Sequence, residues 1–113
     1  MQSGQSTAIG SSGVGRDIKI IAQASGVRIA EYTLHPGERH PWHHHTEVSD
    51  RFYCLQGLVG VETRDPPAQF RLHPGESCEV PAGTVHFASN AGSEPCRYLL
   101  IQALGKYDYI RAV

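Results

Sequence analysis

The stretch Gly37-Glu-Arg-His-Pro-Trp-His43-His-His45-Thr-Glu-Val-Ser-Asp50-Arg-Phe-Tyr-Cys-Leu-Gln-Gly57 contains a run of three histidines. A second stretch, Gly75-Glu-Ser-Cys-Glu-Val-Pro81-Ala-Gly83-Thr-Val-His86-Phe-Ala-Ser-Asn90, contains one more. Side chains alternate between the two faces of a strand, so His43 and His45 point the same way, about 7 Å apart along the backbone. With His86 on a neighbouring strand, these imidazoles can close on one divalent ion at roughly 2.0–2.2 Å per ligand. The spacing therefore predicts a metal site, and neutral imidazole suits zinc, copper, iron and nickel.

Short β-branched or alternating runs, separated by Pro and Gly turns, surround the two histidine stretches. These runs predict strands at residues 18–22, 27–34, 52–55, 58–63, 70–72, 78–80, 85–89 and 96–103. No segment keeps a helical period long enough for a substantial helix. Many short strands at this spacing indicate an all-β sandwich or barrel.

An internal repeat supports a barrel of two similar halves. Leu34-His-Pro-Gly-Glu38 recurs as Leu72-His-Pro-Gly-Glu76, and each copy leads into one of the histidine stretches. Two Greek-key halves of a jelly roll would place both histidine strands side by side inside the barrel. The histidines within the two repeated turns are expected to be hydrogen-bonding groups of the turns rather than metal ligands.

Composition limits the classes of protein that remain. A chain of 113 residues and 12.4 kDa is expected to form a polar N-terminal tail at 1–16 and one domain at 17–113. A net charge of -1 and a pI near 6.6 argue against nucleic acid or an anionic membrane as partner. There is no long apolar run and no signal-peptide pattern, and the three cysteines lack a paired spacing. We therefore expect a cytoplasmic protein with reduced thiols.

The two histidine stretches closely resemble the two motifs of the cupin superfamily, in its small single-domain form. The matching positions are Gly37, His43, His45 and Gly57 in the first motif and Gly75, Pro81, Gly83, His86 and Asn90 in the second. The resemblance implies a double-stranded β-helix, or jelly-roll barrel, with a metal ion in its mouth. It does not imply one reaction, because this fold hosts many.

Asp50 departs from the cupin pattern, because it stands where the first motif has Glu. Asp is one methylene shorter, so its carboxylate falls short by about 1.5 Å unless the backbone or the ion shifts toward it. Asp50 can ligate the metal directly or act through a bound water. Alternatively, Glu47 takes its place, or the three histidines bind the ion without a carboxylate.

Other side chains are candidates for roles around the ion. His40 and Tyr53 are candidates for proton transfer if they reach the barrel mouth, as is the Asp50 carboxylate. Arg97 follows a hairpin next to the His86 strand and is the best candidate to hold a substrate carboxylate. Phe52 would supply an apolar wall for the ligand.

These residues predict a metal-dependent enzyme that acts on a small polar or phenolic molecule. With iron the expected reaction is a dioxygenase-type oxidation, and with manganese, nickel or zinc an isomerase or lyase reaction. The alternative is a non-catalytic module that binds or senses a small ligand through its metal. Exposed sheet edges and a small core also predict a homodimer, to which the N-terminal tail would contribute by docking on the partner.

Overall fold

The computed structural model describes residues 17–113, which form ten strands and no helix. The strands are β1 (Asp17–Ala24), β2 (Val27–Leu34), β3 (His43–His44), β4 (Ser49–Gln56), β5 (Val59–Thr63), β6 (Ala68–Leu72), β7 (Ser77–Val80), β8 (His86–Asn90), β9 (Cys96–Ala103) and β10 (Ile110–Arg111). All eight predicted strands are present within two or three residues of their expected ends, and the short strands β3 and β10 are additional. The predicted polar tail at 1–16 lies outside the described residues. Within 17–113 no helix is long and apolar enough to cross a membrane.

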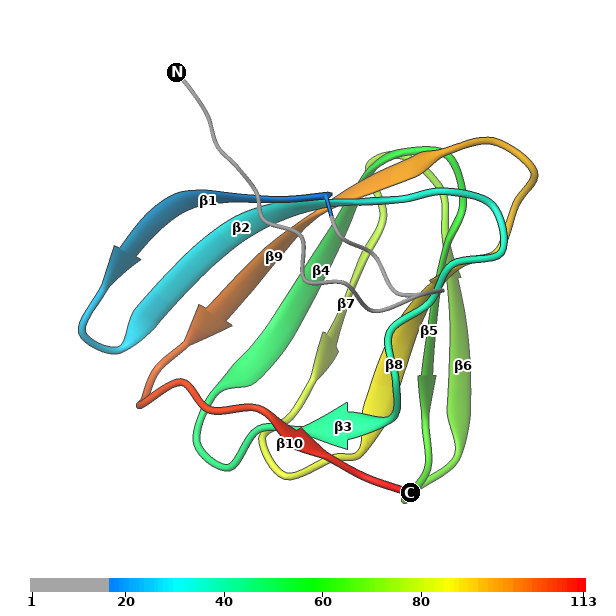
Figure 1. Ribbon diagram of the computed structural model, residues 1–113. Coiled ribbons are helices and arrows are strands. Elements are labelled where there is room, and N and C mark those ends of the chain that lie inside the picture. Colours follow the sequence, from blue (N-terminus) through cyan, green and yellow to red (C-terminus); the bar gives the residue numbers. More distant parts are fainter. Residues whose placement is uncertain (1–16) are drawn as a thin grey trace.

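The strands form two antiparallel five-stranded sheets that face each other (Figure 1). One sheet has the order β1-β2-β9-β4-β7 and the other the order β10-β3-β8-β5-β6. Most neighbours within a sheet are distant in sequence, as in a jelly roll whose chain winds from one sheet to the other. The predicted all-β double-stranded β-helix is therefore confirmed. The pairing of β3 with β8 also confirms that the two histidine stretches lie side by side.

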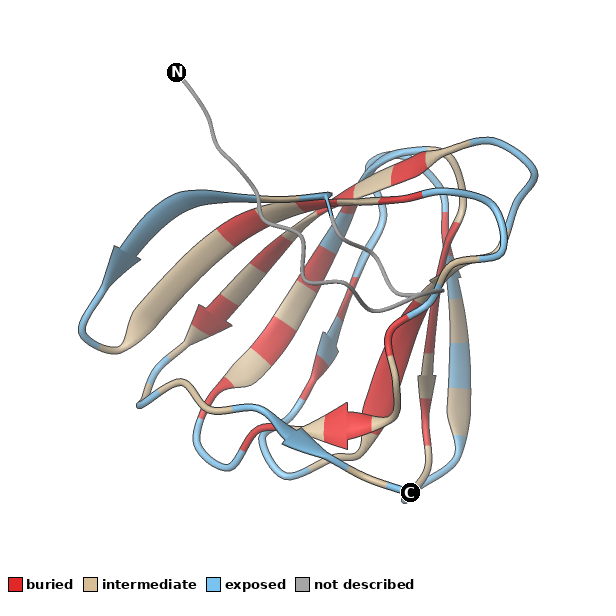
Figure 2. Cartoon of the chain, viewed as in Figure 1, coloured by how far each residue is buried: buried red, intermediate tan, exposed pale blue. Residues whose placement is uncertain are grey.

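Alternation along the central strands decides which side chains enter the barrel (Figure 2). In β9, buried and partly exposed residues alternate without interruption from Cys96 to Ala103. The face of β9 that points inward therefore carries Cys96, Tyr98, Leu100 and Gln102. All three cysteines of the chain are free and buried, which agrees with the expectation of reduced thiols. Cys54 belongs to the hydrophobic core cluster, as expected for a packing residue.

The two repeated Pro-Gly turns have the same structure. At 35–38 and at 73–76, the histidine carbonyl accepts a hydrogen bond from the glutamate N–H, at 3.0 and 2.9 Å respectively. In both turns the glutamate carboxylate accepts a hydrogen bond from the histidine N–H at 2.8 Å. The glycines have φ angles of 87° at Gly37 and 91° at Gly75, a region that suits glycine because it has no Cβ. The sequence repeat thus marks two equivalent turns, one before each histidine motif.

Asn90, the last residue of the second motif, ties the two sheets together. Its Nδ2 donates to the carbonyl of Leu34 at 2.9 Å, at the end of β2, and to the carbonyl of Glu94 at 2.7 Å. Its Oδ1 accepts from the N–H of Gly92 at 2.8 Å. The amide therefore binds backbone groups of the end of β2 and of the connection that leads from β8 toward β9.

Gly57, the last residue of the first motif, has a positive φ and lies close to neighbouring atoms. Its φ is +78°, and an added Cβ would lie 2.8 Å from the Cβ of Cys96, whereas Gly37 has a similar φ and open space around it. Gly37→Ala should therefore cost about 1–2 kcal/mol of unfolding free energy from backbone strain alone. Gly57→Ala should cost about 1–3 kcal/mol more, because the methyl group also clashes. Urea unfolding measures the unfolding free energy of both variants. An equal loss of unfolding free energy in the two variants would contradict the crowding at Gly57.

Candidate metal centre

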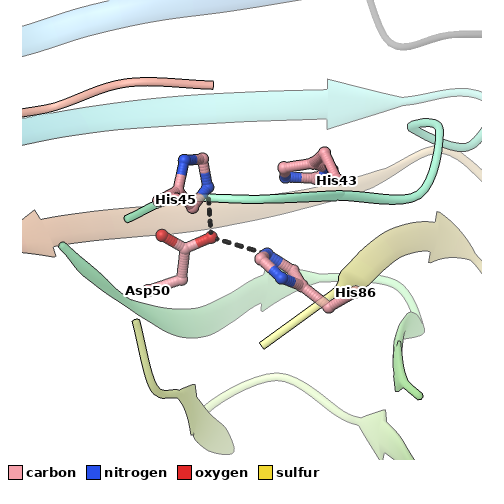
Figure 3. A group of neighbouring side chains, drawn as sticks. All are labelled: His43, His45, Asp50 and His86. Atoms are coloured by element: carbon pink, nitrogen blue, oxygen red, sulfur yellow. Dashed lines mark hydrogen bonds and ion pairs between the residues drawn. The ribbon is translucent and has the colours of Figure 1, made fainter. Parts of the chain in front are cut away.

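Four buried side chains converge between the strands (Figure 3). They are His43 on β3, His45 directly after the end of β3, Asp50 on β4 and His86 on β8. Each offers one nitrogen or oxygen ligand atom, and these atoms all lie within 4.8 Å of one another. Three imidazoles and one carboxylate at this separation form a cluster suited to a divalent metal ion.

The backbone of the second motif positions the histidines of the first. In the pairing of β3 with β8, His43 lies directly opposite His86. The turn before β8 adds a second link, because the N–H of Gly83 donates to the carbonyl of His45 at 2.7 Å. The Pro-Ala-Gly turn of the second motif therefore holds the backbone of the first motif in place.

Each of the three imidazoles is oriented by a backbone carbonyl. Their Nδ1 atoms lie 2.8, 2.6 and 2.7 Å from the carbonyl oxygens of Pro41, Asp108 and Thr84, for His43, His45 and His86 respectively. A carbonyl only accepts hydrogen bonds, so each Nδ1 carries a proton and each Nε2 presents its lone pair when the ring is neutral. This is the arrangement by which proteins orient metal-binding histidines. The donor set therefore fits a metal ion.

Asp50 reaches the histidines despite its shorter side chain. Its Oδ2 lies 3.2 Å from Nε2 of His45 and 2.9 Å from Nε2 of His86. Only 1% of Asp50 is exposed. Burial by itself would raise the pKa of this carboxyl, but the hydrogen bonds to the two histidines outweigh burial and hold the pKa below its usual range. The carboxylate is thus ionised and stands within the cluster.

Glu47 does not enter the cluster, although it was the alternative to Asp50. Its carboxylate accepts a hydrogen bond at 2.9 Å from the backbone N–H of Lys106, and the residue is exposed. The strand β3 ends at His44, so the alternation that would have placed Glu47 with His45 stops before it. The structure brings Asp50, and not Glu47, to the three histidines.

Protonation differs between His43 and His45. Burial, with the neighbouring His86, lowers the pKa of His43 to about 3, so this ring is neutral. Burial also disfavours the charged form of His45, but the hydrogen bond and charge of Asp50, together with the hydrogen bond to the Asp108 carbonyl and the Asp108 charge, outweigh burial and raise its pKa. A cation at the centre would replace the proton that His45 shares with Asp50.

Two of the other predicted site residues lie beside the centre. The ring of Phe52 packs edge-on to His86, with the ring centroids 6.2 Å apart. His40 is buried, its Nε2 lies 3.1 Å from the hydroxyl of Tyr98, and its ring centroid is 6.5 Å from that of His43. Both residues therefore line the interior next to the metal cluster.

The structure does not bring Tyr53 or Arg97 to the centre. Tyr53 is exposed and alternates with the buried Phe52 and Cys54, so it lies on the outer face of β4. Arg97 is on the outer face of β9, where Nη1 bonds to a carboxylate oxygen of Glu31 at 2.7 Å. The expectation that these two residues act in the barrel mouth is corrected by strand alternation, which points them away from it.

Residues that sequence reasoning missed complete the site. Gln102 is 1% exposed, and its Nε2 donates to Oδ1 of Asp50 at 3.0 Å. Tyr109 stacks on His43 with ring centroids 4.4 Å apart, and the ring of Tyr107 lies 5.6 Å from that of His45. Gln102 was detectable as the next inward position after Tyr98 and Leu100 in a predicted strand. No sequence signal indicated that the segment after β9 would cross the mouth.

This chain belongs to the cupin domain family, whose sequence profile matches residues 30–102. The match spans more than half of the chain and includes both histidine motifs and the whole metal cluster. Curated proteins gave no match.

Solved structures share the fold. An uncharacterized conserved protein with a double-stranded β-helix domain from Klebsiella pneumoniae is 21% identical with a TM-score of 0.78, covering 94% of this chain and 90% of that one. The protein TT1209 from Thermus thermophilus is 26% identical with a TM-score of 0.71, covering 87% and 90%. Oxalate decarboxylase from Lactobacillus farciminis, solved with formate, is 21% identical with a TM-score of 0.78. That match covers 95% of this chain but 33% of the decarboxylase.

Removal of the Asp50 charge should weaken metal binding. We expect Asp50→Asn to lower the affinity for Zn²⁺ or Co²⁺ by at least about 10–100-fold, and Asp50→Glu to retain the ion. Glu47→Gln is the matched control, since its carboxylate bonds to the backbone of the Lys106 segment instead. Competition titration against a chelator measures all three variants. An unchanged affinity in Asp50→Asn would favour a site made by the histidines alone.

Burial of neutral His40 should make the metal-free protein sensitive to acid. Its pKa is lowered to about 4, chiefly by burial and then by His86. In the unfolded chain the pKa is near 6.5, so between these values the unfolded state binds more protons than the native state. Stability should therefore fall as pH drops below about 6.5, by up to about 3 kcal/mol at pH 4 from this group. Urea unfolding at several pH values should show a shallower decline for His40→Gln, and identical declines would contradict this assignment.

Proposed function

We propose that this cupin is a metal-dependent enzyme whose ion binds the oxygen atoms of a small polar or phenolic substrate. The observation that supports the proposal best is the orientation of the three imidazoles by backbone carbonyls, with their Nε2 atoms directed to the Asp50 cluster. Burying so many polar groups together has a cost, which a bound cation would offset further than their own hydrogen bonds do. Iron, manganese, nickel and zinc all suit three imidazoles and a carboxylate.

A bound ion would supply Lewis acidity, or electrons if it is a redox metal, to the ligand oxygen atoms. The chain's own residues would hold and surround the ligand. Phe52, Tyr32 and Tyr98 form an aromatic wall, in which the two tyrosine rings are parallel with centroids 5.1 Å apart. Such a wall restricts water and favours a flat or partly apolar molecule.

The side chains around the centre favour chemistry at the ion over proton transfer by the protein. Burial lowers the pKa of His40 to about 4 and raises the pKa of Tyr107 to about 12. Burial also raises the pKa of Tyr98 well above its ordinary value. A general acid or base works best with a pKa near the operating pH. We therefore assign the chemistry to the ion, as a dioxygenase-type oxidation or as an isomerase or lyase reaction.

The lack of a general acid or base among His40, Tyr98 and Tyr107 also favours a second candidate. This candidate is a non-catalytic module that binds or senses a small ligand through its metal. The stacking of Tyr109 on His43 covers part of the mouth, as a binding site that retains its ligand would require. Metal binding cannot separate the two candidates, because both require the ion. Turnover of a substrate separates them, because only the enzyme has it.

Metal analysis and oxygen uptake test the proposed function together. Protein purified without added metal or nickel resin should contain one ion per chain and consume oxygen with a catechol, thiol or keto-acid substrate. His86→Ala should lose both the ion and the activity. His44→Ala is the matched control, because His44 lies on the other face of β3 and outside the cluster. A full complement of metal without turnover on any substrate would favour the binding module, and His86→Ala with its metal intact would refute the site.

We also propose that the protein forms a homodimer through the edge strand β1. This strand is at one end of its sheet and exposes Ile20 and Ile21 to 46% and 52%. An exposed apolar edge is commonly covered by a second chain.

Ile21→Lys should therefore shift a dimer toward monomer in sedimentation experiments, since it places a charge on the β1 edge. Leu55→Lys is the control, because Leu55 is a similarly exposed apolar residue on β4. A full-length wild-type chain that sediments as a monomer at micromolar concentration would contradict the dimer.

A further inference from the structure

A cleft with both polar and apolar groups in its lining lies at the end of the barrel, and Gln102, which bonds to Asp50, is one of its lining residues. It has a volume of about 640 Å³ and lies between the β1–β2 turn and the segment that follows β9. Figure 1 shows both of these elements at the same end of the first sheet. The side chains that matter here are Gln23, Ser25, Arg28, Gln102, Lys106 and Tyr107, all of which line the cleft.

The charge of the cleft is positive. Arg28 and Lys106 both line it, and none of the described residues that line it is acidic. The carboxylate of Glu47 lies close by, because it accepts a hydrogen bond from the backbone N–H of Lys106 at 2.9 Å. Within 17–113 no carboxylate forms an ion pair with Arg28, whereas Arg51 and Arg97 each have one. A partly buried guanidinium without a protein carboxylate is the side chain best suited to bind the carboxylate of a ligand.

Arg28 is held in a fixed position. Its Nη1 donates to the hydroxyl of Tyr32 at 2.9 Å and to Oε1 of Gln102 at 2.8 Å. The guanidinium carbon lies 4.9 Å from the ring centroid of Tyr107 and 5.9 Å from that of Tyr32. The side-chain hydrogen bonds of Arg28 within 17–113 all use Nη1. Nε and Nη2 are the remaining donors of a planar group whose orientation is already set, which reduces the entropy cost of binding.

A row of three side chains connects the cleft to the metal centre. Arg28 on β2 pairs with Gln102 on β9, and Gln102 pairs with Asp50 on β4. The Gln102 amide accepts from Arg28 at 2.8 Å and donates to Asp50 at 3.0 Å. None of the four cluster residues lines the cleft, so the side chain of Gln102 is what connects the cleft to the centre.

We propose that this cleft is an anion subsite, in which Arg28, assisted by Lys106, binds a carboxylate of the ligand whose other end reaches the metal. The inference rests on the proposed metal-binding function and narrows the ligand to small organic acids with a second oxygen-bearing end. The structural alternative is that Arg28 only orients Gln102, in which case the charge of the ligand would not matter.

Matched ligand pairs separate these two roles of Arg28. The visible spectrum of the Co²⁺-loaded protein is titrated with succinate and glutarate and with their half-amides, succinamate and glutaramate, which lack one charge. The better-fitting diacid should bind roughly tenfold more tightly than its half-amide, as a charge-assisted pair predicts. In Arg28→Gln this ratio should fall to near one while Co²⁺ still binds. Arg71→Gln, an exposed arginine on β6, should keep the wild-type ratio.

The inference is overturned if diacid and half-amide bind equally to the wild type, or if the preference persists in Arg28→Gln. If Arg28→Gln loses Co²⁺ or fails to fold, the ratio of diacid to half-amide affinity is measured in Arg28→Lys and Lys106→Gln instead. A reduced preference in either variant supports the subsite, and an unchanged preference in both overturns it. If the wild type binds no Co²⁺, the proposed metal function fails. Calorimetry then measures the binding of succinate to the metal-free wild type and to metal-free Arg28→Gln. Binding to the wild type that is lost in Arg28→Gln supports the subsite. No binding to the wild type, or binding that persists in Arg28→Gln, overturns it.

Discussion

Asp50 is an ionised carboxylate with 1% of its surface exposed, and a buried charge must be compensated by the groups around it. Hydrogen bonds to His45, His86 and Gln102 provide that compensation. Those three residues are themselves held by backbone carbonyls or by Arg28. These partners lie on β8, on β9 and just after β3, so the carboxylate links segments of both sheets. The metal cluster is therefore also an organising element of the barrel.

The mouth of the barrel is built by the last part of the chain. The backbone and hydroxyl of Thr46 donate to the carboxylate of Asp108 at 2.8 and 2.6 Å. The carbonyl of Asp108 accepts the Nδ1 proton of His45. Tyr107 and Tyr109 flank Asp108 and pack on the histidine rings. The segment that covers the site thus also sets the tautomer of one predicted ligand, so access to the ion and the orientation of His45 are linked.

The cupin fold by itself does not define a reaction, because function resides in the side chains placed on it. In this chain the inner surface combines an aromatic wall of Phe52, Tyr32 and Tyr98 with a positive cleft around Arg28. The proposed ligand, a small acid that is partly apolar or planar, would match this combination of an aromatic wall and a cation. The outer faces of β4 and β9, where Tyr53 and Arg97 lie, do not contribute to this surface.

The sequence by itself determined the fold class, eight of the strands and the three histidines of the cluster. These features depend on local rules, namely strand alternation, Pro-Gly turns and the spacing within each motif. The choice of Asp50 over Glu47 required the tertiary structure, because β3 ends at His44 and the chain then turns. Likewise, the row from Arg28 through Gln102 to Asp50 depends on the register among β2, β9 and β4. Register and the path of the segment after β9 arise from contacts between residues far apart in the chain, which spacing along one strand cannot reveal.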